Sequence, residues 1–197
     1  MALSWPALAA AASVTATIPV PSQPPPPDVA SRDPIEVRVL QGDLLWIAGQ
    51  RVRLAGIASI DRAQRCQVGG GFVSCGAKAA EVLSQAIGGH NVRCTVVGEE
   101  ASPYVRDPPV LKGRCQAHGT DLAASVLAAG YAVALPASGY RQMAMEACAA
   151  RRGGWAGYVE SPLTFRPRRN GAPVAPVFIG ARARTPCLAA LPEETGR

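Results

Sequence analysis

Three consecutive strand-like segments, at positions 35–40, 44–48 and 50–57, constrain the fold of this chain more than any other feature: apolar and polar residues alternate in the first and third, and the second is apolar. A period of two is typical of strands that have one buried and one solvated face. The short turn Ala48-Gly49-Gln50 joins the last two segments. The sequence therefore predicts a three-stranded meander.

A helix, two further strands and two more helices are predicted after the meander. Ala79, Leu83 and Ile87 share one helical face, and Gly88-Gly89 ends that helix. The later strands are predicted at 91–97 and 110–117, and the later helices at 121–129 and 139–152. The order β-β-β-α-β-β-α-α predicts an α+β domain, a five-stranded β-barrel of the oligonucleotide/oligosaccharide-binding (OB) type with about three helices.

Proline marks both ends of the chain as poor places for packed structure. Of the 18 prolines, 13 fall at positions 19–34 and 162–192. We therefore expect an apolar leader and Pro-rich linker at residues 1–33, one domain at 34–165, and a Pro/Arg-rich, disordered tail at 166–197. Most of the net charge of +6 falls in that tail, so the overall basicity says little about partners.

The first twenty residues carry no charge. Their apolar stretch is short and interrupted by proline, so we expect no stable membrane span in the mature form. Small residues at Ala10 and Ala12, or at Val14 and Ala16, suit a signal peptidase, whereas the positively charged start of a secretory signal is missing. We expect export, to the periplasm or out of the cell, with a cytoplasmic location as the alternative.

Six cysteines also favour export, because disulfides persist in oxidising compartments. One pair brackets a glycine loop and another falls on two predicted strands, which predicts the pairings Cys66–Cys75 and Cys94–Cys115. We interpret Cys148 as a core thiol, and Cys187 either pairs with it or stays free. The chain has no Cys-x-x-Cys, and its histidines lack metal-ligand spacing, so zinc is not favoured.

The segment from Gln41 to Asp61 reads Gln-Gly-Asp-Leu at its start and Arg-Leu-Ala-Gly-Ile-Ala-Ser-Ile-Asp at its end. It resembles the staphylococcal nuclease (thermonuclease) family, in which Asp-Gly-Asp-Thr opens one strand and Arg-Leu-x-Gly-Ile-Asp-Ala-Pro-Glu closes the next. Further pieces follow in the family's order: Cys75-Gly76-x-x-Ala79, Gly119-x-Asp121-Leu122, Gly130-Tyr131-Ala132, Tyr140, Glu146 and Gly154-Trp155-x-Gly157. The resemblance covers roughly residues 34–166 and implies the same OB-type fold.

The resemblance also implies a set of site residues. In the family, two aspartates and a backbone carbonyl hold Ca²⁺, a glutamate acts as base or positions the attacking water, and two arginines bind the phosphate. Carried over to this chain, Asp43 and Ser59 are the candidate metal ligands. Arg53, Asp61 and Arg106 are the candidate catalytic residues.

Several expected polar positions have changed. Ala58 stands where the second aspartate is expected, and because Ca²⁺ takes about 6–8 oxygen ligands, its loss removes both a ligand and a negative charge. Asp61 replaces the glutamate and is one methylene shorter, and a misplacement of about 1 Å costs on the order of a hundredfold in rate. Leu44 replaces the threonine, Gln41 replaces a further acid, and extra residues follow Arg106.

These departures favour a nuclease-like protein whose calcium-dependent phosphodiesterase activity is lost or severely impaired, with a face that binds nucleic acid, another polyanion or a protein. The alternatives are an active metal-dependent nuclease, with Ca²⁺ as cofactor, and a structural domain of the cell envelope. Aromatic residues make up only 5% of the chain, so no base-stacking platform is expected. We interpret Trp46 and Trp155 as core residues.

Overall fold

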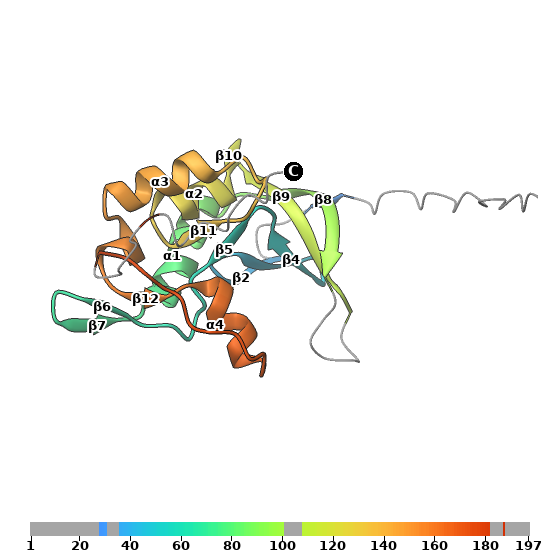
Figure 1. The fold of residues 1–197 in the computed structure, drawn as a ribbon. Helices are drawn as coiled ribbons and strands as arrows, with labels where there is room; N and C mark the ends of the chain where they lie inside the picture. The colour runs from blue at the N-terminus through green and yellow to red at the C-terminus, as the bar shows by residue number, and fades with distance from the viewer. Residues whose placement is uncertain (1–27, 31–35, 101–107, 182–186, 188–197) are drawn as a thin grey trace, which may run out of the picture.

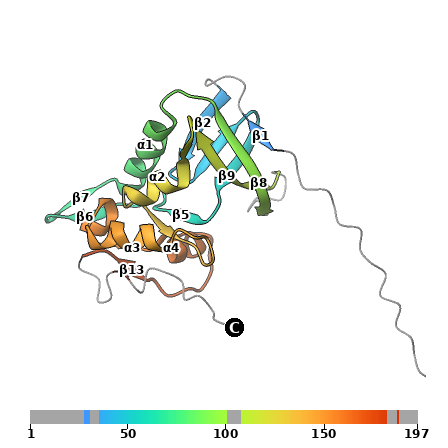
Figure 2. The same ribbon diagram turned by 90° about the horizontal axis from the view of Figure 1, so that it is seen from above.

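The computed structural model describes residues 28–30, 36–100, 108–181 and 187. Within them the chain is an α+β structure in which helices gather on one side of a mixed sheet (Figures 1 and 2). The helices are α1 (Cys75–Ile87), α2 (Leu122–Ala128), α3 (Arg141–Ala149) and α4 (Pro162–Arg169). The first three are those predicted from the sequence, and α4 was not predicted.

The main sheet has the strand order β1-β8-β9-β4-β3-β2. Its strands are β1 (Val29–Ala30), β2 (Val37–Gln41), β3 (Leu44–Ile47), β4 (Gln50–Leu54), β8 (Val92–Glu100) and β9 (Val110–Ala117), and β10 (Thr120–Asp121) adds to β9. Neighbouring strands are antiparallel except β4 and β9, which are parallel. The predicted meander is confirmed as β2, β3 and β4.

A two-residue turn connects β3 to β4. Ile47 pairs with Gln50, and both Ala48 and Gly49 between them have positive φ, at 46° and 86°. Two consecutive residues with positive φ match the twist of a right-handed hairpin. This turn fixes the register in which Trp46 lies opposite Arg51 and Leu44 opposite Arg53.

The sheet does not close into the predicted barrel within the part of the chain that the structure describes. After Gly56, whose φ of 82° turns the chain, β5 (Ile57–Ser59) leaves the sheet and pairs with β11 (Ala132–Ala134). The outer edge of β8 is covered by β1, and β2 packs against α1. The end strands of the sheet are β1 and β2, and among the described residues no pairing joins them, so the sheet stays open.

Two further strand pairs extend the structure beyond the main sheet. They are β6 (Cys66–Val68) with β7 (Gly71–Val73), and β12 (Val159–Glu160) with β13 (Phe178–Ile179). The β6–β7 hairpin projects away from the sheet (Figure 1). A short 3₁₀ helix, η2 (Gly153–Ala156), precedes β12.

The chain remains ordered past the expected start of the tail at residue 166. Ser161 caps α4 by accepting a hydrogen bond from the Leu163 N–H, and Pro162 occupies the first turn, where its missing N–H costs nothing. Residues 170–177 then lead into β13. The prolines that predicted disorder therefore include one that begins a helix.

Three disulfides join described cysteines. The predicted pairings Cys66–Cys75 and Cys94–Cys115 are confirmed, and the third disulfide joins Cys148 to Cys187. The last one means that Cys148 is not the core thiol we expected. Three disulfides are typical of a protein from an oxidising compartment. None of the helices described here has the length and apolar character needed to cross a membrane.

The two central tryptophans have different environments. Trp155 is buried, with 2% of its surface exposed, as predicted. Trp46 is 36% exposed, so its interpretation as a core residue is wrong. Its neighbours Leu45 and Ile47 are fully buried, and because successive side chains on a strand point to opposite faces, Trp46 faces outward.

Candidate functional site

Asp43 lies between β2 and β3 and is completely buried. Gly42 precedes it because a Cβ there would come within 2.5 Å of the Ala79 Cβ on α1. The Ser59 N–H donates to Asp43 Oδ2 at 3.0 Å, and Arg53 Nη1 donates to Oδ1 at 3.2 Å. The packing of α1 against this turn thus fixes a carboxylate inside the protein.

Arg166 of α4 completes the environment of this carboxylate. Its Nη1 lies 2.8 Å from Asp43 Oδ2 and its Nη2 lies 2.9 Å from Asp43 Oδ1, so the two side chains form a bidentate ion pair. A carboxylate has about four acceptor sites. Ser59, Arg53 and the two nitrogens of Arg166 together supply that many donors, so the hydrogen-bonding capacity of Asp43 is fully used.

The pKa of Asp43 lies below its ordinary value of 3.8. Burial acts in the opposite direction, because it disfavours the charged form. The positive charges of Arg166 and Arg53, with the hydrogen bonds from Arg166 and the Ser59 amide, outweigh burial. Asp43 is therefore an ionised carboxylate that depends on its two arginines.

One nitrogen of Arg166 is surrounded by oxygen atoms. Besides Asp43 Oδ1, Nη2 lies 2.8 Å from the Ser59 carbonyl oxygen, 3.3 Å from Ser59 Oγ and 3.4 Å from Gln41 Oε1. Carboxylate, carbonyl, hydroxyl and amide oxygens are the ligands that Ca²⁺ prefers. The candidate metal ligands Asp43 and Ser59 therefore surround a cation, but that cation is the guanidinium of Arg166.

Asp61, the second carboxylate of the site, is 1% exposed and also contacts α4. Its Oδ1 accepts from Arg169 Nη1 at 2.6 Å and from the Ala63 N–H at 3.1 Å. Its Oδ2 lies 3.8 Å from Arg166 Nε, and both atoms are buried without a hydrogen-bond partner among the described residues. A small shift of either side chain would bring Asp61 Oδ2 and Arg166 Nε within hydrogen-bonding distance.

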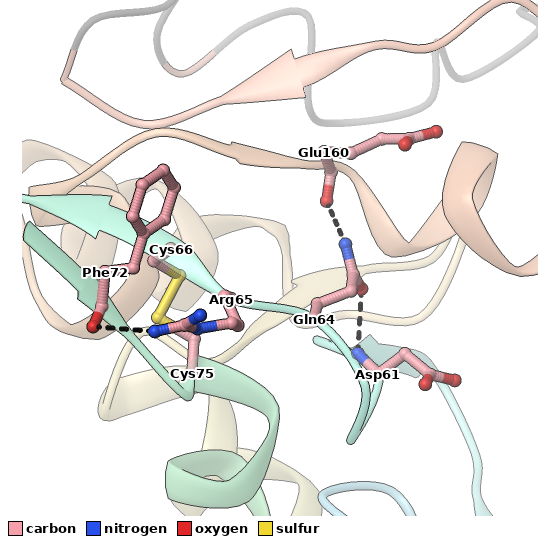
Figure 3. Close-up of a disulfide and its surroundings, with 7 residues drawn as sticks. All are labelled: Asp61, Gln64, Arg65, Cys66, Phe72, Cys75 and Glu160. Atoms are coloured by element: carbon pink, nitrogen blue, oxygen red, sulfur yellow. Dashed lines mark hydrogen bonds between the residues drawn. A yellow bond between two sulfur atoms is a disulfide. The ribbon is translucent and has the colours of Figure 1, made fainter.

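Gln64 ties the loop that carries Asp61 to the segment before α4 (Figure 3). Its Oε1 accepts from the Asp61 N–H at 2.8 Å, and its Nε2 donates to the Glu160 carbonyl oxygen at 2.7 Å. The Cys66–Cys75 disulfide follows immediately. Gly76 lies so close to the Asp61 carbonyl that a Cβ would clash with it. These contacts hold Asp61 and α4 in a fixed relation.

A cleft of about 590 Å³ opens over these residues. Four of the residues that line it are arginines: Arg51, Arg53, Arg166 and Arg169. Asp61, Glu100 and Ala58 line it too, and Glu100 Oε1 accepts from Arg53 Nε at 2.7 Å. Arg51 Nη2 donates to the Pro108 carbonyl oxygen at 2.9 Å.

The structure brings together four of the five residues proposed from the sequence, namely Asp43, Arg53, Ser59 and Asp61. The fifth, Arg106, lies outside the described residues. Sequence reasoning missed Arg166, Arg169 and Glu100. Ser161-Pro162 is a recognisable helix start, and Arg166 and Arg169, three residues apart on that helix, share one face.

The residues of the site do not fit a calcium ion as they are arranged. All acceptor sites of Asp43 are occupied, and Ala58 supplies no second carboxylate at the position where the resemblance requires one. Across the described part of the chain, there is no group of three or more His, Cys, Asp or Glu residues placed to hold a metal. The chemistry that the site offers is hydrogen bonding and positive charge from fixed guanidinium groups.

Comparison with known proteins does not assign the chain to a family. No family model matches its sequence, and no curated protein matches it.

Proposed function

We propose that this chain is a periplasmic or secreted, nuclease-like protein that binds phosphodiester polyanions at its arginine-lined cleft and has no calcium-dependent phosphodiesterase activity. The proposal joins the resemblance of the Gln41–Asp61 segment to the geometry of the site. The observation that carries it is the ion pair between Arg166 and Asp43.

The absence of calcium chemistry follows from the acceptor sites of Asp43. A divalent cation needs oxygen ligands, and Arg166 Nη2 already lies among Asp43 Oδ1, the Ser59 carbonyl oxygen and Gln41 Oε1, where an ion would have to sit. For an ion to enter, the guanidinium of Arg166 would have to leave, because the donors of Arg166, Arg53 and Ser59 already fill the acceptor sites of Asp43. Arg166 thus supplies within the chain the positive charge that Asp43 requires.

Anion binding follows from the donors that remain. A guanidinium carries five N–H donors, and within the described residues the bonds of Arg53 use Nε and Nη1. Arg169 is 46% exposed and bonds Asp61 through Nη1. Both residues line the cleft and have N–H donors that these bonds do not use, and guanidinium groups held in place by carboxylates are preorganised to bind phosphate.

Binding is tested with a labelled abasic oligonucleotide, a phosphodiester chain without bases, by fluorescence anisotropy at several salt concentrations. We expect Arg169→Ala to weaken binding and to lower the slope of log Kd against log salt by about one. Arg141→Ala, an exposed arginine on α3 outside the cleft, is the matched control and keeps the full slope. Equal effects of the two substitutions would refute a role for the cleft.

Catalysis is tested with single-stranded DNA and Ca²⁺. We expect no hydrolysis above that of a buffer control. Hydrolysis that depends on Ca²⁺ and disappears in Asp43→Ala would overturn the proposal in favour of the active-nuclease alternative.

The role of Arg166 is tested by restoring the two expected carboxylates through substitution, once in the presence of Arg166 and once with Arg166 replaced. Ala58→Asp/Asp61→Glu supplies the expected acids, but we expect it to bind Ca²⁺ weakly in calorimetry because Arg166 still pairs with Asp43. Adding Arg166→Gln to that variant should raise Ca²⁺ affinity by at least about tenfold, since it frees the oxygens around Nη2. Equal affinities of the double and triple variants would show that Arg166 does not compete with the ion.

A further inference from the structure

A row of three side chains crosses the outer face of the main sheet next to the cleft. Arg38 of β2 pairs with Trp46 of β3, and Trp46 pairs with Arg51 of β4. Directly opposite residues on antiparallel strands project from the same face. Trp46 therefore lies between two guanidinium groups on adjacent strands, and we call these three residues the Arg38–Trp46–Arg51 row.

Trp46 is open to solvent and borders a hollow. It is 36% exposed, and a depression of about 230 Å³ beside it is lined by Glu36, Arg38, Trp46, Ala48 and Gly49. At the other end of the row, Arg51 lines the cleft described above. The row thus continues from the cleft to a second hollow with an indole at its wall.

We propose that the Arg38–Trp46–Arg51 row is a binding subsite for one nucleotide of a single-stranded nucleic acid whose backbone continues into the cleft. This inference rests on the proposed function and names its ligand. A base stacks on the exposed face of an indole regardless of sequence, while guanidinium groups on both sides bind phosphates. In a duplex the bases stack on each other, so a single strand is the form that fits.

Glu36 sets the direction in which the nucleotide enters. Glu36 lines the hollow beside Trp46, and its carboxylate repels phosphate and accepts hydrogen bonds from the N–H groups of bases, including the N3–H of thymine. The base therefore occupies the hollow, and the phosphates lie along the arginines toward the cleft.

The test compares a labelled oligothymidylate of about ten nucleotides with an abasic strand of equal length. We expect the natural protein to prefer the strand with bases, and Trp46→Ala to reduce that preference about 5- to 100-fold. Trp46→Phe retains an aromatic face and should keep most of the preference. Arg38→Ala should lower the salt slope by about one for both strands, whereas the control Arg141→Ala should not.

The outcomes separate this inference from the proposed function. If the abasic strand binds through the cleft but the natural protein and Trp46→Ala discriminate equally between the two strands, the subsite is wrong and the proposed function stands. If neither strand binds the natural protein, the proposed function fails and the subsite with it. A neutral oligosaccharide that quenches the emission of Trp46, when oligothymidylate does not, would also overturn the inference.

Discussion

Arginines belong to both the cleft and the Arg38–Trp46–Arg51 row, but the fold treats them differently. In the cleft, Arg53 and Arg166 are held by Asp43, a carboxylate with no exposed surface. In the row, Arg38 and Trp46 lie on the solvated face of the sheet. The comparison teaches that arginines paired with a buried carboxylate support the fold as well as the proposed binding, whereas side chains on the solvated face contribute to binding alone. Substitutions of Asp43 or Arg166 should therefore cost stability, and substitutions of Arg38 or Trp46 should cost only binding.

Asp43→Asn should have the largest effect on folding. It removes the negative charge between Arg53 and Arg166, and breaking a buried ion pair costs about 3–5 kcal/mol of unfolding free energy. Urea denaturation near neutral pH measures the change. Glu81→Gln breaks the exposed pair with Lys78 and serves as the control, with no measurable loss expected. If Asp43→Asn unfolds with the same free energy as the natural protein, the buried ion pairs of the cleft do not stabilise the fold, and the cleft does not differ from the row in this respect.

Arg166→Gln should have the next largest effect. Asp43 keeps Arg53 and the Ser59 amide as partners, and Arg166 is partly exposed, so we expect a loss of about 1–3 kcal/mol. Arg168→Gln on the same helix is the matched control, because Arg168 pairs with Glu160 near the surface. If both variants lose the same unfolding free energy in urea, the contacts of Arg166 with Asp43 stabilise the fold no more than a surface ion pair does.

Acid should remove the stabilisation that ionised Asp43 gives to the fold. Because the folded-state pKa of Asp43 is lowered, ionised Asp43 stabilises the fold above its unfolded-state value of 3.8, and this contribution is lost as the pH falls through the folded-state pKa. Unfolding free energy measured from about pH 5 downward should fall less steeply for Asp43→Asn than for the natural protein. Parallel curves would contradict the assignment.

Trp46→Ala should have the smallest effect on stability. An outward-facing side chain on a wet face makes few core contacts, so the unfolding free energy should change by about 0.5 kcal/mol or less. The same urea titration measures it. A loss as large as that of Asp43→Asn would mean that Trp46 supports the sheet, and the row would then no longer differ from the cleft.

Local patterns in the sequence were enough for β2, β3, β4, β8 and β9 of the main sheet and for three helices, but they missed β1 and β10. Alternation at residues 35–40 and 50–57, with the apolar segment 44–48 between them, predicted β2, β3 and β4, and the spacing of strand and loop cysteines predicted two disulfides. The Gln41–Asp61 segment also indicated that Asp43, Arg53, Ser59 and Asp61 belong together. These features depend on residues near in sequence or on one hairpin, where period and turn chemistry act directly.

The orientation of Trp46 was not available from the sequence. Leu44, Leu45, Trp46 and Ile47 are all apolar, so the pattern does not show which of them face the core. The open sheet was also missed, since local patterns do not show which distant strands pair: β5 leaves the sheet to pair with β11, and β1 pairs with β8.

By itself, the sequence determined that this chain forms an α+β domain with Asp43 just before one strand and Arg53 on the next, and the resemblance predicted a second acid where Ala58 stands. Only the tertiary structure decided what neutralises that acid. Arg166 is 123 residues from Asp43 along the chain, and its approach depends on the cap at Ser161, the pairing of β12 with β13 and the Gln64 bridge. A buried carboxylate must find a positive charge, but which charge reaches it is settled by packing between distant segments.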